Sequence, residues 1–104
     1  MARALAGLKP AARQCHVDSL RDNDLRSARI CLDVWRQVDP ADAALVQARR
    51  RLAERWVAVG EQRLDAGEVD AATRALEQAR ALDAGTAGLA DFSARLSRAQ
   101  APQP

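Results

Sequence analysis

The sequence of 104 residues predicts an all-α protein of about five helices that pair as antiparallel hairpins. Hydrophobic residues make up 48% of the chain, but the only aromatic ones are two tryptophans and one phenylalanine. The apolar residues are therefore mostly Ala, Leu and Val, which favours helices over strands. Apolar residues also recur at spacings of three and four, and one pair of such segments is repeated at an offset of 44 residues.

Both ends of the chain are expected to lie outside the folded domain. Residues 1–9 contain no apolar run long enough for a secretory signal or a membrane span, and we expect a flexible lead-in. Pro10 suits a first helical turn, where its missing N–H is not needed. Prolines prevent a helix from continuing through residues 100–104, which we expect to be a flexible tail. The predicted domain covers residues 10–99, and such ends are typical of a piece of a longer protein.

The first hairpin is predicted within residues 11–40, with its turn at Asn23. Asparagine is the residue that, after glycine, best tolerates the left-handed conformation that ends a helix. Several positions of this hairpin recur in a second hairpin 44 residues later. The matching pairs are Leu20 and Leu64, Asn23 and Gly67, Ala28 and Ala72, and Leu32 and Leu76.

One long helix is predicted between the hairpin turns, from about Pro40 to Asp65. Asp39 is a suitable N-cap, Pro40 fits the first helical position, and Asp42 places negative charge near the helix start. Apolar residues continue at helical spacing through the whole segment.

The second hairpin is predicted from Trp56 to Ala84, with its turn at Gly67, where the absence of a Cβ permits the left-handed conformation. Gly60 lies on the apolar face, although glycine costs roughly 1 kcal/mol relative to alanine inside a helix. This cost indicates close packing, which we expect to be against Ala72 of the facing helix.

A closing helix is predicted after residue 84, because Leu89, Phe92 and Leu96 have helical spacing and Thr86 is a plausible N-cap. It would cover the apolar side of the second hairpin, as the terminal helices of repeat arrays do.

The second hairpin resembles the tetratricopeptide repeat, whose pattern is W-x2-L-G-x2-Y followed by A-x3-F and a closing Pro. The matching residues are Trp56, Val59, Gly60, Ala72 and Leu76, and the departures are Arg63 for the aromatic residue, Leu76 for Phe and Ala84 for Pro. The resemblance implies a right-handed α-α superhelix of about two and a half repeats. Because such a repeat spans about 34 residues, residues 40–55 would extend beyond a regular repeat layer.

The resemblance also implies a groove that is lined by the first helix of each hairpin and binds a peptide or helix of a partner protein. The implied groove residues are Arg13, Val17, Leu20, Arg21, Val57, Glu61, Leu64 and Asp65. Leu20 and Leu64 could instead belong to the core. The expected function is therefore a non-catalytic protein–protein interaction module. The alternative is a homo-oligomerisation or scaffold module that uses residues 40–55, and we expect a monomer or a weak homodimer.

The charged residues do not indicate a nucleic-acid or membrane partner, because the formal net charge is only +2 and the two signs are interspersed. Arg49, Arg50 and Arg51 spread around a helix and suit a solvated, salt-bridged face better than a phosphate site. The preference for arginine over lysine, with abundant alanine, is typical of a GC-rich genome and favours a bacterial source.

No catalytic, metal or cofactor site is expected. His16 is the only histidine, and it neighbours Cys15, Asp18 and Ser19 on a predicted helix. Adjacent helical residues point in different directions, so a nucleophile, a base and an orienting acid cannot converge from this segment alone. Two cysteines and one histidine also lack any zinc-binding spacing.

Cys15 and Cys31 fall on the two helices of the first hairpin and can form a disulfide if their Cα atoms approach within about 7 Å. The alternative is two small buried thiols. A disulfide would indicate a periplasmic or other extracytoplasmic location, whereas free thiols would indicate the cytoplasm.

Overall fold

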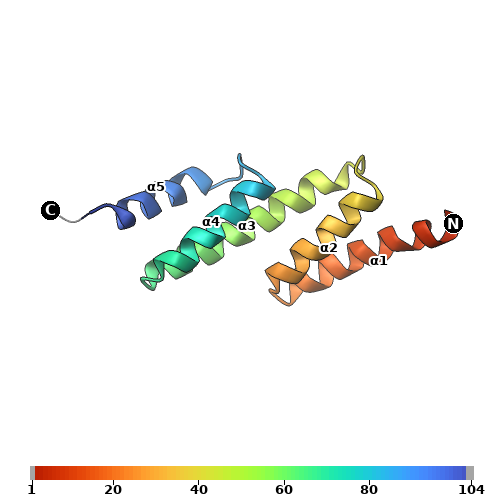
Figure 1. Cartoon of the computed structure of the whole chain (residues 1–104), viewed down its shortest axis with the longest axis horizontal. Coiled ribbons are helices and arrows are strands. Elements are labelled where there is room, and N and C mark those ends of the chain that lie inside the picture. The colour runs from red at the N-terminus through yellow and green to blue at the C-terminus, as the bar shows by residue number, and fades with distance from the viewer. Residues whose placement is uncertain (1, 103–104) are drawn as a thin grey trace. The chain divides into compact units, whose positions relative to one another are not determined.

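The computed structural model describes the backbone of residues 2–102 and the side chains of residues 7–102. Within residues 2–102 the chain forms five α-helices and no strand, so the predicted all-α class is confirmed (Figure 1). The helices are α1 (Ala2–Arg21), α2 (Leu25–Val38), α3 (Ala44–Asp65), α4 (Val69–Leu82) and α5 (Leu89–Gln100). The chain divides into two compact units, an N-terminal unit (Met1–Leu52) and a C-terminal unit (Ala53–Pro104).

The first helix begins earlier than predicted, at Ala2, and Pro10 lies inside it instead of in its first turn. Because proline has no N–H, the carbonyl group one turn before Pro10 receives no intrahelical hydrogen bond from it. The described part of the expected lead-in is therefore helical. Met1 and residues 103–104, which belong to the expected flexible ends, lie outside the described residues.

The helix pairs α1–α2 and α3–α4 are joined by turns with the same hydrogen bonding. In the first, the N–H groups of Asn23 and Asp24 donate to the carbonyl groups of Leu20 and Ser19, at 3.0 and 2.8 Å. In the second, Gly67 and Glu68 donate to Leu64 and Arg63, at 2.9 and 2.8 Å. This pattern is the Schellman motif, which requires a left-handed residue at the position after the C-cap. Asn23 has φ +57° and Gly67 has φ +80°, so the predicted left-handed turns are confirmed.

The helix after each turn is capped differently. Asp24 is the N-cap of α2, and its carboxylate accepts hydrogen bonds from the backbone N–H and the hydroxyl of Ser27. These hydrogen bonds lower the pKa of Asp24. Glu68 is the N-cap of α4 but makes no side-chain capping bond, and its carboxylate accepts a hydrogen bond from Arg63 at 3.2 Å instead. Glutamate is not among the side chains that are preferred at an N-cap.

The long helix α3 begins at Ala44, later than the predicted start at Pro40. Asp39 is the C-cap of α2 and not the N-cap of α3. The capping group is Asp42, which accepts a hydrogen bond from the backbone N–H of Ala44 at 3.0 Å. Asp39 and Asp42 are both paired with Lys9 of α1, a contact that sequence spacing does not reveal.

Each unit has its own apolar core. In the N-terminal unit the buried apolar residues are Ala12, Leu25, Ala28, Cys31, Leu32, Trp35, Leu45, Ala48 and Leu52. In the C-terminal unit they are Ala53, Val57, Ala72, Ala75, Leu76, Ala79, Leu82, Leu89, Phe92 and Leu96.

The helices α3, α4 and α5 meet at Gly60. A Cβ atom added there would lie 2.6 Å from Cε2 of Phe92 and 3.1 Å from Cβ of Ala75. A packing reason for this glycine was expected, but its nearest neighbours are Phe92 and Ala75 and not Ala72. The prediction missed Phe92 because it considered only the facing helix of the hairpin, whereas Phe92 lies on α5.

The N-cap of α5 is Gly88, which has φ +82°, and the predicted capping role of Thr86 is wrong. Thr86 is buried in the loop before the helix, and its carbonyl accepts a hydrogen bond from the N–H of Leu89 at 3.2 Å. The loop itself is held by Asp83, whose carboxylate accepts from the N–H of Gly85.

Candidate functional site

The exposed large apolar side chains, as far as the structure describes them, all lie in the N-terminal unit. They are Leu8, Val17, Ile30, Val34 and Val46. Single exposed apolar residues are common on protein surfaces, and an interaction surface is indicated where several of them share one face. The described part of the C-terminal unit exposes no comparable side chain.

Ile30 and Val34 form the strongest pair in this set. They are one helical turn apart and therefore share a face of α2. Ile30 is the most exposed of the five residues, at 64%. The buried residues Ala28, Leu32 and Trp35 occupy the other side of the same helix, so α2 carries apolar side chains both toward the core and toward solvent.

The groove residues predicted on α1 lie on one stripe of that helix, because Arg13, Val17 and Arg21 are four residues apart. All three are exposed, and Leu20 is half-buried beside them. The guanidinium of Arg13 lies over the ring of Trp35, 5.1 Å from its centroid. Arg21 donates to the carboxylate of Asp18 at 3.0 Å. The α1 stripe therefore consists of an apolar side chain between two cations.

The groove residues predicted on α3 do not form an equivalent stripe. Val57 is only 5% exposed and belongs to the core of the C-terminal unit, so its side chain has little exposed surface to offer a groove. Glu61 and Leu64 are half-buried. Asp65 is exposed, but its carboxylate accepts a hydrogen bond from Arg95 of α5 at 2.7 Å. Val57 lies close to the loop that precedes α5, since a Cβ atom added at Gly88 would be 3.6 Å from its Cγ1.

His16 is part of the core of the N-terminal unit. It is 3% exposed, and its Nδ1 lies 2.9 Å from the carbonyl oxygen of Ala28. A carbonyl only accepts, so Nδ1 carries the proton in this contact. Nε2 has no hydrogen-bond partner among the described residues. The ring meets that of Trp35 edge-on at 6.1 Å, so His16 joins α1 to α2.

A polar cluster connects α1 to the segment between α2 and α3. Lys9 Nζ lies 2.9 Å from the carboxylate of Asp39 and 3.0 Å from that of Asp42. Asp42 also accepts from the indole N–H of Trp35 at 2.9 Å. The hydrogen bonds from the N–H of Ala44, from Lys9 and from Trp35 lower the pKa of Asp42 to about 2. The two carboxylates in turn raise the pKa of Lys9. Every member of this cluster is engaged in holding the fold.

Cys15 and Cys31 lie at disulfide-bonding distance, with their Cα atoms 5.8 Å apart. The sequence had left open a disulfide or two buried thiols, and this geometry fits the disulfide. Cys15 is exposed, whereas Cys31 is only 7% exposed. The pair joins the middle of α1 to the middle of α2.

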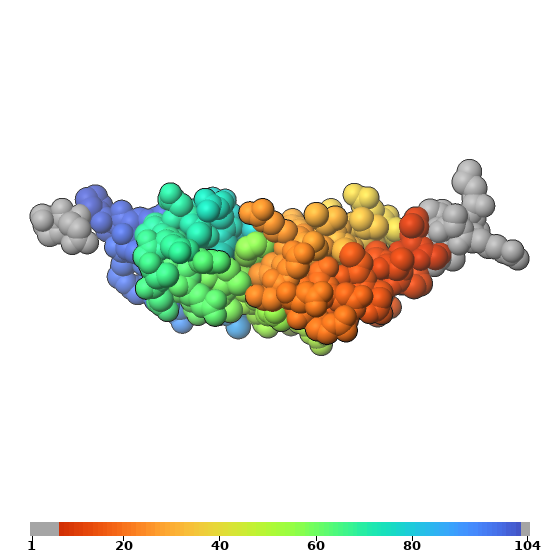
Figure 2. Space-filling view, turned by 90° about the horizontal axis from the view of Figure 1, so that it is seen from below, coloured from red at the N-terminus to blue at the C-terminus, as the bar shows by residue number. Residues whose placement is uncertain are grey.

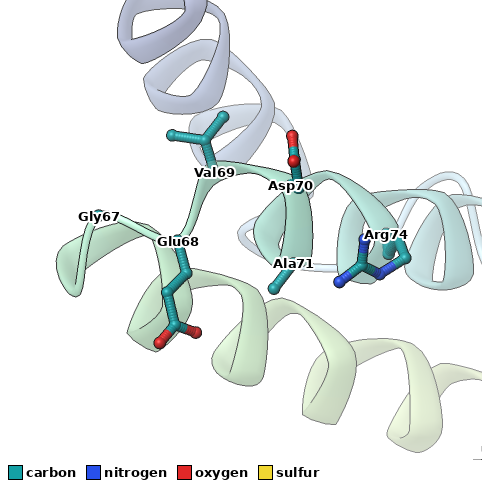
Figure 3. Close-up of a pocket in the computed structure, with 6 residues that line it drawn as sticks. All are labelled: Gly67, Glu68, Val69, Asp70, Ala71 and Arg74. Atoms are coloured by element: carbon teal, nitrogen blue, oxygen red, sulfur yellow. The ribbon is translucent and has the colours of Figure 1, made fainter.

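An open hollow of about 470 Å³ lies at the start of α4, lined by Gly67, Glu68, Val69, Asp70, Ala71 and Arg74. In Figure 3, Glu68 and Ala71 point toward α3, whereas Val69 and Asp70 point away from it. The charges in the hollow are of both signs, and Glu68 is already paired with Arg63. The hollow therefore offers no convergent set of groups for a ligand.

Other kinds of site are not found in the described part of the chain. Residues 2–102 contain no group of three or more His, Cys, Asp or Glu side chains that could hold a metal ion. None of the helices that the structure describes combines the length and the apolar character needed to cross a lipid bilayer.

Comparison with protein-family models, with curated proteins and with solved structures finds no match to this chain. The function must therefore be inferred from the surfaces and contacts described above. The internal repeat rests on the chain's own residues, most clearly on the two Schellman turns at Asn23 and Gly67.

Proposed function

We propose that the chain is a non-catalytic protein–protein interaction module whose working surface is on the α1–α2 hairpin. The observation that carries this proposal is the distribution of exposed apolar side chains: Val17, Ile30 and Val34 lie on this hairpin, and the described residues of the C-terminal unit offer no equivalent. Exposed apolar side chains flanked by charged ones are typical of surfaces that bind amphipathic segments.

The partner segment is a peptide or helix with an apolar face. On α1, Val17 lies between Arg13 and Arg21, which would favour acidic residues at the edge of that face. A tetratricopeptide-like stacking of the two hairpins belongs to this proposal, and its support is the repeated turn and the internal repeat of 44 residues. The C-terminal unit would then act mainly as a folded support.

Site-specific photo-crosslinking in cells that naturally contain the chain tests the proposal. A benzophenone amino acid replaces Val17 or Ile30 in separate variants, and a matched control carries it at the exposed Ala94 of α5. We expect a discrete adduct with another protein at position 17 or 30 and none at position 94. The position that reacts would identify which face of the hairpin binds. No adduct at either position, or the same adducts at position 94, would contradict the proposal.

A second candidate is self-association through residues 40–55, which Val46 supports because it is 61% exposed near the start of α3. Light scattering across a range of concentrations separates the two candidates. A mass that rises to that of a dimer, and returns to that of a monomer in Val46→Asp, would favour self-association. A constant monomer mass at high concentration would exclude it.

The disulfide-bonding distance between Cys15 and Cys31 supports a periplasmic or other extracytoplasmic place for this function. Reducing compartments keep such pairs as thiols.

A further inference from the structure

The outward face of α2 combines apolar and basic side chains. Ile30 and Val34 lie one turn apart on this face and are 64% and 40% exposed. Arg26 is also exposed and precedes Ile30 by four residues, so it lies at the start of the same stripe. Figure 2 shows orange atoms, which belong to the end of α1 and to α2, on the surface of the N-terminal unit.

Three arginines form a basic edge beside the apolar pair. Arg29 and Arg36 are seven residues apart and therefore share a stripe of α2, and Arg26 lies one turn before Arg29. The only acidic residue of α2 is Asp33, whose carboxylate lies 3.4 Å from Nε of Arg29. Arg26 and Arg36 form no ion pair with the residues that the structure describes. The outward face of α2 therefore carries net positive charge and two guanidinium groups that could meet the acids of a partner.

The charge of the whole chain is also divided unevenly. The N-terminal unit has ten basic and six acidic residues, which gives a formal net charge of +4, whereas the C-terminal unit has six basic and eight acidic residues and a net charge of −2. Complementary charge steers partners toward a surface and disfavours wrong ones. The excess of positive charge and the exposed apolar side chains are thus on the same unit, where they favour an acidic partner.

We propose that the outward face of α2 binds an acidic amphipathic helix of a partner protein. This inference rests on the proposed function and selects one face and one partner chemistry for it. Apolar side chains of the partner, at spacings of three and four, cover Ile30 and Val34. Carboxylates along one edge of the partner helix pair with Arg26 and Arg36, which are about 15 Å apart along α2. The partner's acidic residues therefore extend over about three helical turns.

The α1 stripe is less suited to this partner, because both of its cations are engaged. Arg13 lies over the ring of Trp35, and Arg21 pairs with Asp18 at 3.0 Å. An anionic lipid surface also fits α2 less well. A helix that lies on a membrane needs a large apolar face and a basic polar face, whereas α2 exposes two large apolar side chains and has Asp33 within its basic edge.

Photo-crosslinking from α2 of the full chain, in cells that naturally contain it, tests the proposal. A benzophenone amino acid replaces Gln37, which is exposed and one turn after Val34, so that both apolar residues are retained. We expect an adduct with another protein. Mass spectrometry of the adduct should place the crosslink in a segment with apolar residues at spacings of three and four and with two or more Asp or Glu residues on one edge.

Charge reversal tests the basic edge. Arg26→Glu with Arg36→Glu should lower the yield of this adduct by about tenfold, because two attractive pairs become repulsive. Arg26→Gln with Arg36→Gln, which only removes the charges, should lower it less. The matched control is Arg74→Glu with Arg98→Glu, two exposed arginines of the C-terminal unit, and it should leave the yield unchanged. Circular dichroism of each purified variant checks that the helices are retained.

Several outcomes would overturn the inference. An adduct at position 17 with none at position 37 would move the surface to α1, and an equal yield in the charge-reversed variant would remove the acidic partner. Both results would leave the interaction module standing, which only the absence of adducts at all tested positions of the hairpin would contradict. A crosslinked segment that is neutral or basic, or that belongs to a second copy of this chain, would also refute the inference. Co-sedimentation of the purified chain with phosphatidylglycerol vesicles, lost in Arg26→Glu with Arg36→Glu, would replace the partner helix with a lipid surface.

Discussion

Replacement of Gly60 by alanine tests the packing of α3, α4 and α5 in the C-terminal unit. The added Cβ would lie 2.6 Å from Cε2 of Phe92 and 3.1 Å from Cβ of Ala75. The best separation for two nonbonded carbon atoms is about 3.5–4.0 Å. Phe92 is fully buried, so its ring cannot move into solvent to relieve the contact.

The expected effect is a balance of two opposing terms. Alanine is favoured over glycine inside a helix by about 1 kcal/mol. An extra methyl group in a well-packed core costs typically about 1–3 kcal/mol. The rigid ring of Phe92 and the backbone-attached Cβ of Ala75 can move little, so the cost lies in the upper part of this range. We expect the free energy of unfolding to fall by about 1–2 kcal/mol.

Urea unfolding followed by circular dichroism measures this change, and the chain offers a matched control. Gly7 is also helical, but a Cβ at that position would meet no atom within 4 Å. Gly7→Ala should therefore leave the free energy of unfolding unchanged or raise it by up to about 1 kcal/mol. In a Phe92→Leu background, Gly60→Ala should cost less than in the natural chain, because the shorter side chain removes the close contact. A Gly60→Ala protein as stable as the natural chain would refute the packing argument.

Three further predictions concern the turns, the polar cluster and the loop before α5. Asn23→Ala should lower the free energy of unfolding by about 1 kcal/mol, and by more than Asn23→Gly does, because φ is +57° at this residue and alanine tolerates that conformation less well than glycine. Equal effects of the two substitutions in urea unfolding would contradict this prediction. The pKa of Asp42 is lowered in the folded protein to about 2. Its contribution to stability is thus complete above its unfolded pKa of about 4 and is lost as the pH falls through about 2. Asp42→Asn should reduce the fall of the urea unfolding midpoint between pH 4 and pH 2. A fall as large as in the natural chain would show that other acidic residues cause it. The hydroxyl of Thr86 is buried without a partner among the described residues. Thr86→Val should therefore leave thermal stability unchanged or raise the free energy of unfolding by about 1 kcal/mol. A clear loss of stability would point to an unrecognised partner of the hydroxyl.

Features fixed by local backbone chemistry could be predicted from the sequence. Asn23 and Gly67 were correctly predicted as left-handed residues, because few residue types tolerate that conformation. The apolar spacing also gave the number and pairing of the helices. These signals lie within a few residues of the feature that they predict.

Features fixed by contacts between distant segments were missed. The start of α3 depends on Asp42, which is held by Lys9 from another helix. The tight contact at Gly60 involves Phe92, and the buried Val57 lies close to the loop before α5. The proposed binding surface is the extreme case, because neither the exposure of Ile30 nor the burial of Val57 follows from periodicity. Ile30 and Val57 both lie at helical spacings that fit a core position or a groove position equally well.

The contacts that the structure shows for α1 and α5 differ in kind. Burial of Leu89, Phe92 and Leu96 makes the hold on α5 sensitive to denaturant and temperature, which weaken apolar packing. On α1 the buried side chains that the structure describes are Ala12 and His16, and Cys15 lies at disulfide-bonding distance from Cys31 of α2. A disulfide between these cysteines would restrain the unfolded chain, so we expect the N-terminal hairpin to gain stability from it that the C-terminal unit does not share. The exposed residues Val17, Ile30 and Val34 are on that same hairpin, so the bond would also stabilise the surface that we propose for partner binding.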